Sequence, residues 1–288
     1  MILTQNLAPK NTLSKTLHFH KMQGAGNDFI VFDNRQYNFL LDEIIAMTPK
    51  LCHRRFGAGA DGVLVLQESK NDSDYRMIYR NADGSDAGMC GNGARCLARF
   101  AVKQGFPDSL SFMVHNQQYR AQVNLSEVTI HFPVEPKPDN FVEIDGYEAL
   151  NVYSGTEHVV VWIEDDKLSD ESWLRECGRK IRYDSKRFPE GTNVNFISKH
   201  FSDGIIEMKT YERGVEDLTL ACGTGALATA VSYHKKYFSN KPGEFQFMLQ
   251  SLGGILKTEL EYDGKSGSYK NLKLTGPADF VFEGTYHL

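Results

Sequence analysis

The sequence predicts an α+β fold made of two similar domains, in each of which a strand-rich sheet wraps a helix. The main observation is an internal duplication, because residues 79–94 recur as residues 211–226. The tyrosine, the cysteine, two glycines and an alanine share one offset, 222 − 90 = 132. Weaker echoes in the same order join residues 26–31 to 155–160 and residues 60–64 to 191–195. An offset the size of a domain indicates two copies of one fold and not a solenoid.

The local patterns predict the individual elements. Strands are expected where short apolar or alternating runs occur, at residues 30–32, 63–66, 128–132, 159–162 and 205–208. Helices are expected after each glycine-rich cysteine loop, at residues 94–103 and 226–236. Prolines mark residues 133–140 as a linker. The polar residues 1–17 are expected to form a flexible extension before the first domain begins near His18.

The composition excludes several classes of function. The formal net charge is -5, so no basic surplus favours nucleic acid or an anionic membrane as a partner. No apolar run is long enough to cross a bilayer, and the N-terminal residues lack the apolar core of a secretory signal. We therefore expect a cytoplasmic protein with a small-molecule substrate.

The cysteines are expected to be free thiols, since their number is odd and their spacing fits no disulfide framework. No two of them are spaced as Cys-x-x-Cys, so nothing in the spacing predicts a zinc site. Cys52, Cys96 and Cys177 are expected to pack in the core. Cys90 and Cys222 differ from these three because they occupy matched positions of the duplication.

Cys90 and Cys222 each precede small residues and then a helical run, which predicts that each lies at a helix N-terminus. The partial positive charge there favours a thiolate, and the backbone N–H groups suit a bound carboxylate. One such loop is often only a tight turn beside a buried thiol. Two copies in a duplicated fold indicate a shared site, with one thiol on each face of a substrate α-carbon.

This pair predicts inversion of configuration at an α-carbon. One sulfur removes the proton as a thiolate, and the other delivers a proton from the opposite face as a thiol. Backbone N–H groups stabilise the carbanion through its carboxylate. This chemistry requires no metal and no organic cofactor.

Other residues are expected to complete the site. Glu212 and Arg213 could be a surface ion pair, but beside the second cysteine loop they are expected to hold the substrate ammonium and carboxylate. His158 follows an echoed loop and is expected to line the cleft, although a lone histidine is more often part of a core. The amides in the echoed loops are expected to bind substrate in addition to forming turns; they are Asn27, Asn81 and Asn193.

Taken together, these motifs resemble the diaminopimelate epimerase family over nearly the whole chain. The motifs are residues 22–29 (MQGAGNDF), 81–85 (NADGS), 90–96 (CGNGARC), 211–214 (YERG), 221–225 (ACGTG) and 275–278 (TGPA). The resemblance implies two domains with mixed sheets rolled around a central helix, residues 18–134 plus the returning strand 277–288, and residues 135–276. It also implies a homodimer that epimerises LL- to meso-diaminopimelate without a cofactor, in lysine and peptidoglycan precursor synthesis.

The same resemblance implies a role for each site residue. Cys90 and Cys222 would transfer the proton, and His158 and Glu212 would assist them. The residues implied to bind substrate are Asn27, Asn81, Gly91, Asn92, Thr156, Asn193, Glu212, Arg213, Gly223 and Thr224. Of these, Gly91, Asn92, Gly223 and Thr224 would hold the reacting carboxylate through their backbone N–H groups.

Two positions depart from the family pattern. Family members often have Gly-Asn-Pro-His or Gly-Ser-Pro-His where this chain has residues 155–158 (GTEH), and many have glutamine at the position of Gly62. Both positions are expected near the distal end of the substrate. Three alternatives therefore stay open: a racemase of another amino acid with the same two thiols, a non-catalytic amino-acid-binding protein, and a redox role for a Cys90–Cys222 disulfide.

Overall fold

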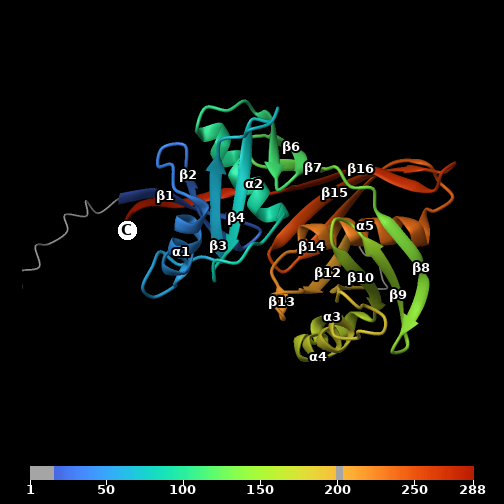
Figure 1. Cartoon of the computed structure of the whole chain (residues 1–288). Helices are drawn as coiled ribbons and strands as arrows, with labels where there is room; N and C mark the ends of the chain where they lie inside the picture. Colours follow the sequence, from blue (N-terminus) through green and yellow to red (C-terminus); the bar gives the residue numbers. More distant parts are fainter. Residues whose placement is uncertain (1–15, 199–203) are drawn as a thin grey trace, which may run out of the picture.

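The computed structural model describes residues 16–198 and 204–288, which form two mixed sheets joined at one edge, each with a central helix (Figure 1). The first half contains β1 (Thr16–Gly24), β2 (Asn27–Asp33), α1 (Leu41–Cys52), β3 (Gly62–Gln67), β4 (Tyr75–Asn81), α2 (Gly91–Lys103), β5 (Ser109–Val114), β6 (Gln117–Val123) and β7 (Val128–Phe132). The second half contains β8 (Lys137–Ile144), β9 (Tyr147–Tyr153), β10 (Glu157–Ile163), α3 (Asp165–Ser169), α4 (Glu171–Arg182), β11 (Asn193–Ser198), β12 (Ile205–Tyr211), β13 (Leu218–Thr219), α5 (Gly223–Tyr237), β14 (Gly243–Ser251), β15 (Gly254–Asp263) and β16 (Ser268–Gly276). The chain closes with β17 (Asp279–His287).

The two halves have the same strand order and the same strand directions. Strands β1 to β7 pair with their successors as antiparallel, parallel, antiparallel, parallel, antiparallel and antiparallel neighbours. The series β9, β10, β11, β12, β14, β15 and β16 repeats these relations in order. Helix α2 follows β4 just as α5 follows β12 and the short β13. The duplication read from the sequence is therefore a duplication of the fold, and the predicted fold class is confirmed.

One antiparallel strand pair, β7 with β16, joins the halves, and in it Leu274 lies opposite Ile130. These two strands hold equivalent places in the two copies, so the junction lies on the pseudo-twofold axis. At the outer edges, β17 pairs with β1 in the first half as β8 pairs with β9 in the second. The domain boundaries expected after residues 134 and 276 stay predictions.

The central helices α2 and α5 are buried along most of their length. Alanines at positions 94, 98 and 101 of α2 and 226, 228 and 230 of α5 are fully buried. Small side chains let the surrounding strands approach the helix axis closely, and a helix that is apolar on most faces belongs inside a protein. Residues of both helices pack into one continuous apolar cluster that spans the two halves.

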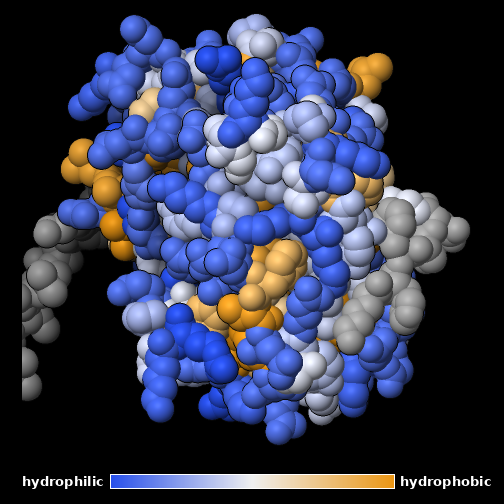
Figure 2. Space-filling view, turned by 90° about the vertical axis from the view of Figure 1, so that its right-hand side faces the viewer, coloured by the Kyte–Doolittle hydropathy of each residue, from blue (hydrophilic) through white to orange (hydrophobic). Residues whose placement is uncertain are grey.

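Apolar residues are gathered inside, in that cluster and two smaller ones. Figure 2 shows that hydrophilic residues cover most of one face of the molecule, with apolar residues exposed near the centre of the view. Among the described residues, no helix has the length and apolar character needed to span a membrane.

The predicted strand runs all lie within strands, and both predicted helices exist but begin three residues earlier, at Gly91 and Gly223.

Two expectations were wrong in part. Thr16 and Leu17 belong to β1 and not to a flexible extension, because Leu17 is fully buried in an apolar cluster; residues 1–15 lie outside the described residues. Residues 137–140 of the expected linker belong to β8, which among the described strands pairs with β9 alone, and prolines are tolerated on such edge strands.

Candidate active site

The site begins at the two cysteines, which are the N-cap residues of the two central helices. Cys90 is the N-cap of α2 with φ -123° and ψ 119°, and Cys222 is the N-cap of α5 with φ -117° and ψ 111°. The matching backbone angles show that the duplicated loops have one conformation. The first N–H groups of a helix have no partner within the helix, so each cysteine lies beside donors available to an anion.

The N-termini of α2 and α5 meet at their first residues. A Cβ placed on Gly223 would lie 3.4 Å from the Cα of Gly91, and one placed on Gly91 would lie 3.6 Å from the Cα of Gly223. Leu274 of β16 packs over both glycines, and its Cδ2 would lie 2.7 Å and 2.9 Å from those same Cβ positions. A side chain at either position would therefore displace Leu274, and the contact brings the two N-cap cysteines to one junction.

Asn92 and Arg95 of α2 hold this junction together. The Asn92 side chain donates from Nδ2 to the carbonyl oxygen of Ala221, the residue before Cys222, at 3.0 Å. Its Oδ1 accepts from Nη2 of the fully buried Arg95 at 2.8 Å. Arg95 also donates from Nε to the carbonyl oxygen of Pro277 at 3.1 Å. The side chain of Asn92 is thus structural, and its backbone N–H is the group left for a substrate.

On the first side of the junction, Cys90 contacts a backbone donor and an amide acceptor. The backbone N–H of Gly93 donates to Sγ at 3.4 Å, and Oδ1 of Asn27 lies 3.8 Å from Sγ. Asn27 donates from Nδ2 to Oδ2 of Asp61 at 2.6 Å. Because a carboxylate can only accept, this bond turns the amide oxygen of Asn27 toward the thiol.

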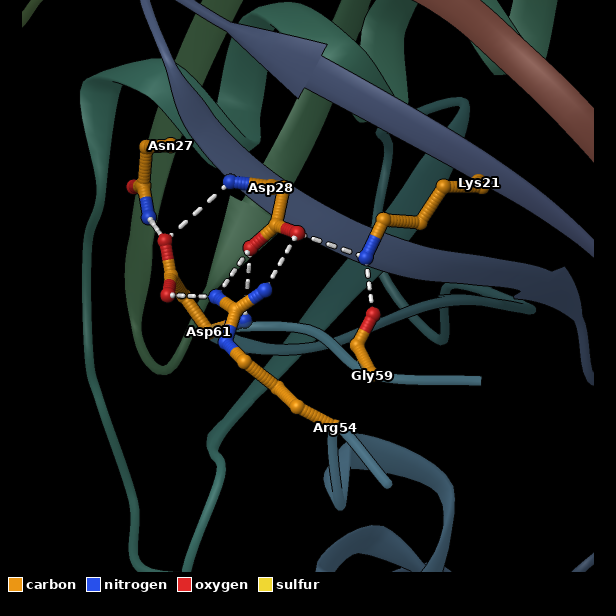
Figure 3. Close-up of polar contacts among 6 residues, drawn as sticks. All are labelled: Lys21, Asn27, Asp28, Arg54, Gly59 and Asp61. Carbon is orange, nitrogen blue, oxygen red and sulfur yellow. Dashed lines mark hydrogen bonds and ion pairs between the residues drawn. The ribbon is translucent and has the colours of Figure 1, made fainter. Parts of the chain in front are cut away.

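A network of charges holds Asp61 in place (Figure 3). Arg54 donates to Oδ1 of Asp61 at 2.7 Å and to both carboxylate oxygens of Asp28 at 2.9 and 3.1 Å. The Nζ atom of Lys21 lies 2.6 Å from Oδ2 of Asp28 and donates to the carbonyl oxygen of Gly59. Burial opposes ionisation of Asp28, but its bonds to Arg54 and Lys21 prevail and lower the pKa of this carboxyl. The network therefore fixes Asn27 through Asp61 and its bond to Arg54.

On the second side, Cys222 lies beside a hydroxyl and a buried imidazole. Its Sγ is 3.7 Å from Oγ1 of Thr224, which is 3.0 Å from Nε2 of His158. Nε2 is also 2.9 Å from Oγ1 of Thr156. His158 is only 1% exposed, and burial, with a smaller effect from the charge of Arg213, lowers its pKa to about 3. The imidazole is therefore neutral at physiological pH.

Burial decides the ionisation of the two thiols in the unliganded protein. It raises the pKa of Cys90 to about 11, although the backbone N–H of Gly93 acts in the opposite direction. Burial raises the pKa of Cys222 as well, and the charge of Glu212 adds to the effect on both thiols. The expectation that the helix ends favour thiolates describes a real contribution, but removal from water outweighs it here.

Glu212 and Arg213 follow β12, and the charge of Arg213 acts on His158. Burial raises the pKa of Glu212, and its charge acts on both cysteines. The Arg213 side chain donates from Nη1 to the carbonyl oxygens of Glu190 and Gly191 at 3.0 and 3.4 Å. Within the described residues, its guanidinium group therefore bonds to main-chain oxygens.

Asn193 and Asn81 are engaged with their own loops in this structure. Asn193 accepts from the backbone N–H of Arg213 at 2.9 Å and donates to the carbonyl oxygen of Glu157 at 2.9 Å, which ties two site loops together. Asn81 donates to Oγ of Ser85 at 3.0 Å within its own turn, and no recorded hydrogen bond joins it to a cysteine loop. Asn193 therefore uses both ends of its amide in these bonds, whereas the bond of Asn81 uses its Nδ2.

Sequence reasoning missed three residues that hold the site: Asp61, Arg54 and Asn195. Asn195 is fully buried, and its Nδ2 lies 3.1 Å from Nδ1 of His158. It lies two residues after Asn193 on β11, and residues at that spacing face the same side of a strand. That periodicity was the available signal. For Asp61 the signal was its place in the echoed segment at residues 60–64.

The described residues contain no cluster of three His, Cys, Asp or Glu side chains arranged to hold a metal ion. All five cysteines are free thiols, and Cys52, Cys96 and Cys177 are buried in packing positions, as predicted.

Comparison with known proteins finds a family model and relatives that carry the same description. The family model described as Diaminopimelate epimerase matches residues 19–131 and 150–281. The chain is 38% identical over 271 residues to Diaminopimelate epimerase of Flavobacterium psychrophilum, covering 93% of this chain and 100% of the relative. It is 36% identical over 286 residues to the protein of the same name from Aquifex aeolicus, covering 93% and 97%.

Two solved structures share the fold at low sequence identity. A phenazine biosynthesis protein of the PhzF family from Bacillus anthracis matches with a TM-score of 0.73 at 12% identity, over 95% of this chain and all of that one. A hydroxyproline epimerase from Agrobacterium vitis matches with a TM-score of 0.66 at 16% identity, over 95% and 93%. At such identities the likeness concerns the fold alone.

Proposed function

Because the chain belongs to the diaminopimelate epimerase family, a family of isomerases, we propose that it interconverts LL- and meso-diaminopimelate by moving the α-proton between Cys90 and Cys222. The observation that carries the mechanism is the contact of Gly91 with Gly223, since it brings two N-cap cysteines to one junction. A reaction that inverts an α-carbon needs an acid and a base on opposite faces, and this junction offers one sulfur from each half.

The proton moves in balanced steps. One cysteine, as a thiolate, takes the α-proton and becomes a thiol, while the electron pair stays on the substrate as a carboxylate-stabilised carbanion. The other cysteine, as a thiol, gives its proton to the opposite face and becomes a thiolate. The enzyme returns to its first state when the two sulfurs exchange protons with water or when the reverse reaction occurs.

The helix ends are suited to the charge that develops. The backbone N–H groups of Gly91, Asn92, Gly223 and Thr224 belong to the first turns of α2 and α5 and have no partner inside their helices. Donors fixed before the reaction stabilise the carboxylate of the carbanion without reorganising.

The remaining proposed roles follow the geometry of the junction. Asn27, held by Asp61, presents its amide oxygen beside Cys90, where the substrate ammonium could bind. Glu212 and Arg213 would hold the ammonium and the distal carboxylate, and His158 would assist Cys222 through Thr224. Thr156, Asn81 and Asn193 are proposed to contact the distal end.

The test is incubation of the purified enzyme with LL-diaminopimelate in heavy water. We expect deuterium at the α-carbon and formation of meso product, and both should be lost in Cys90→Ala and in Cys222→Ala. Binding of the substrate without exchange would favour a non-catalytic binding protein. Activity that requires an oxidised Cys90–Cys222 bridge would favour the redox alternative, whereas we expect oxidation to inactivate because a disulfide offers no base.

A racemase of another amino acid is the second candidate, and one observation favours it. The Thr156 hydroxyl is engaged with His158 at 2.9 Å, and Glu157 is exposed where family members often have proline. This loop therefore presents the charge of Glu157 and the hydroxyl of Thr156, which also contacts His158, where family members often present the amide of an asparagine. A panel of amino acids followed by circular dichroism separates the candidates: turnover of diaminopimelate alone would eliminate the second.

We also propose that the enzyme works as a homodimer in the cytoplasm, in lysine and peptidoglycan precursor synthesis. An exposed apolar run on β17 supports the dimer, with Phe280 38%, Val281 56% and Phe282 48% exposed. Among the described strands, β17 pairs only with β1, so one of its edges is available to a second copy. Sedimentation of the wild type and of Val281→Lys should give a dimer and a monomer; a monomeric wild type would contradict the proposal.

A further inference from the structure

We propose that Asn195 is a positioning residue that fixes which nitrogen of His158 carries the proton, and so commits the Thr224 hydroxyl to donate to Cys222. The inference rests on the proposed function, since it concerns the acid/base groups of that reaction. It is carried by one chain of buried polar contacts that runs from β12 through β11 and β10 to the N-terminus of α5.

The orientation of the Asn195 amide is set by its neighbours. Asn195 is fully buried on β11, between β10 and β12. Its Nδ2 lies 3.3 Å from the carbonyl oxygen of Val159, which can only accept a hydrogen bond. Its Oδ1 accepts from Oγ1 of the buried Thr210 at 2.9 Å. The nitrogen side of the amide therefore faces β10.

This orientation determines the tautomer of His158. The second proton of Asn195 Nδ2 points at Nδ1 of His158, 3.1 Å away, so Nδ1 accepts. The imidazole is neutral and carries one proton, which must then be on Nε2. The charged group that acts on the ring is Arg213, which disfavours a second proton.

The tautomer sets the direction of the remaining bonds. With its proton on Nε2, His158 donates to Oγ1 of Thr224 at 3.0 Å or of Thr156 at 2.9 Å. Thr224 then keeps its own proton, for which Sγ of Cys222 at 3.7 Å and Oγ1 of Thr156 at 3.5 Å are the acceptors within reach. Donation to the sulfur favours its ionised form. In the opposite tautomer Nε2 would accept, and the Thr224 proton would turn away from the sulfur toward the imidazole.

Gly225 connects Asn195 directly to the cysteine loop. A Cβ placed on Gly225 would lie 2.4 Å from Oδ1 of Asn195 and 3.2 Å from Sγ of Cys222. The glycine at this position thus leaves room for the amide beneath the first turn of α5. Asn195 and the reacting sulfur pack against the same backbone atom.

The first test is nitrogen-15 NMR of the unliganded enzyme labelled at histidine, with the His158 signals assigned by their loss in His158→Gln. We expect the pattern of an Nε2–H tautomer. An Nδ1–H tautomer in the wild type would overturn the proposal. This measurement needs no substrate, so it is independent of whether the enzyme acts on diaminopimelate.

The second test is Asn195→Asp, which keeps the shape but replaces the donor with an acceptor, so that the proton moves to Nδ1. We expect the reversed NMR pattern and a fall in kcat of about 10²-fold, with KM changed by less than about threefold. Asn195→Ala should give mixed tautomers and a smaller fall. If Asn195→Asp does not fold, Asn195→Ala and the wild-type spectrum still decide.

The matched control is Asn34→Ala. Asn34 is also fully buried. Its Nδ2 donates to the carbonyl oxygen of Phe39 and to Oε1 of Gln67, and neither contact involves a cysteine loop. It should lose stability as Asn195→Ala does but keep kcat and the His158 tautomer. An equal fall in kcat in the control, or an unchanged kcat in folded Asn195→Asp, would show that Asn195 has only a structural role. If the wild-type enzyme showed no α-proton exchange with LL-diaminopimelate, that result would instead count against the proposed function.

Discussion

Gly91 and Gly223, the first residues of the two central helices, lie so close that a Cβ on Gly223 would be 3.4 Å from the Cα of Gly91. This contact lies beside the β7–β16 junction, and Leu274 of β16 covers both residues. It links the residues that directly follow the two N-cap cysteines. Substitutions at these two glycines should therefore change the distance between the N-termini of α2 and α5.

Gly223→Ala should separate the helix ends and lower both stability and activity. The added methyl would meet Cδ2 of Leu274 at 2.7 Å, so we expect a loss of about 1–3 kcal/mol in the free energy of unfolding and a fall in kcat of at least about tenfold. Gly146→Ala is the control. Alanine costs stability there because φ is left-handed at 83°, but the added methyl group would meet no neighbouring atom. Urea unfolding and α-proton exchange measure both effects; a control with the same loss of kcat would refute the explanation.

Asp61→Asn should misorient Asn27 at Cys90. The substitution leaves a single acceptor oxygen where Asp61 offers one to Nδ2 of Asn27 and one to Arg54, and its NH2 group cannot accept from either donor, so we expect kcat/KM to fall by up to about 10²-fold. Asp33→Asn is the matched control, since Asp33 is a buried carboxylate bonded to Arg35 at 2.6 Å elsewhere in the fold. Steady-state kinetics with folded variants should show the loss at position 61 only, and equal kinetics for both variants would contradict the assignment.

Gly62→Ala should be destabilising although the backbone of Gly62 is outside the left-handed region. The added Cβ would lie 2.4 Å from the carbonyl oxygen of Arg80 and 2.5 Å from Cε2 of Tyr79. We expect a loss of about 1–3 kcal/mol. Gly105→Ala, which has open space and pays only for its left-handed φ of 94°, should lose less. A neutral Gly62→Ala would mean that the neighbours move freely and that glutamine at this position fits the same backbone.

The rate should rise with pH through the neutral range. Burial raises the pKa of Cys90 to about 11 and also raises that of Cys222, so few unliganded molecules carry the required thiolate at neutral pH. Raising the pH produces that form, and we expect kcat/KM to increase by up to about tenfold per pH unit between about 7 and 9. The two thiols titrate as a pair, so the measured pKa values belong to the pair. A decrease in kcat/KM over this range would contradict the ionisation scheme.

Acid should destabilise the fold through His158. Its pKa is 6.5 in the ordinary state and about 3 when buried, so between these values the unfolded chain binds a proton that the folded protein does not. Stability therefore rises with pH over this window, by at most about 1.4 kcal/mol per unit from this residue. The partly exposed His20 and His131 and the buried His234 act in the same direction. Urea unfolding from pH 4 to 7 should show a shallower slope for His158→Gln, and an unchanged slope would contradict this assignment.

The sequence by itself determined the duplication, the two glycine-rich cysteine loops and the position of each on a helix N-terminus. These features are local, since a motif of five residues fixes its own turn and the helix that follows. The same local character made the pair Cys90 and Cys222 predictable, because each copy repeats the same residues at a constant offset. Family membership followed from motifs that are specific only when taken together.

The tertiary structure decided what depends on residues distant along the chain. The pairing of β7 with β16 and the contact of Gly91 with Gly223 exist only once both halves pack, and no local pattern specifies them. Burial reversed the expected ionisation of the thiols, because the loss of water depends on everything packed around a sulfur. Asn195 stayed hidden for the same reason: its function comes from Val159, Thr210 and His158 on neighbouring strands, and only the folded sheet brings those groups to one amide.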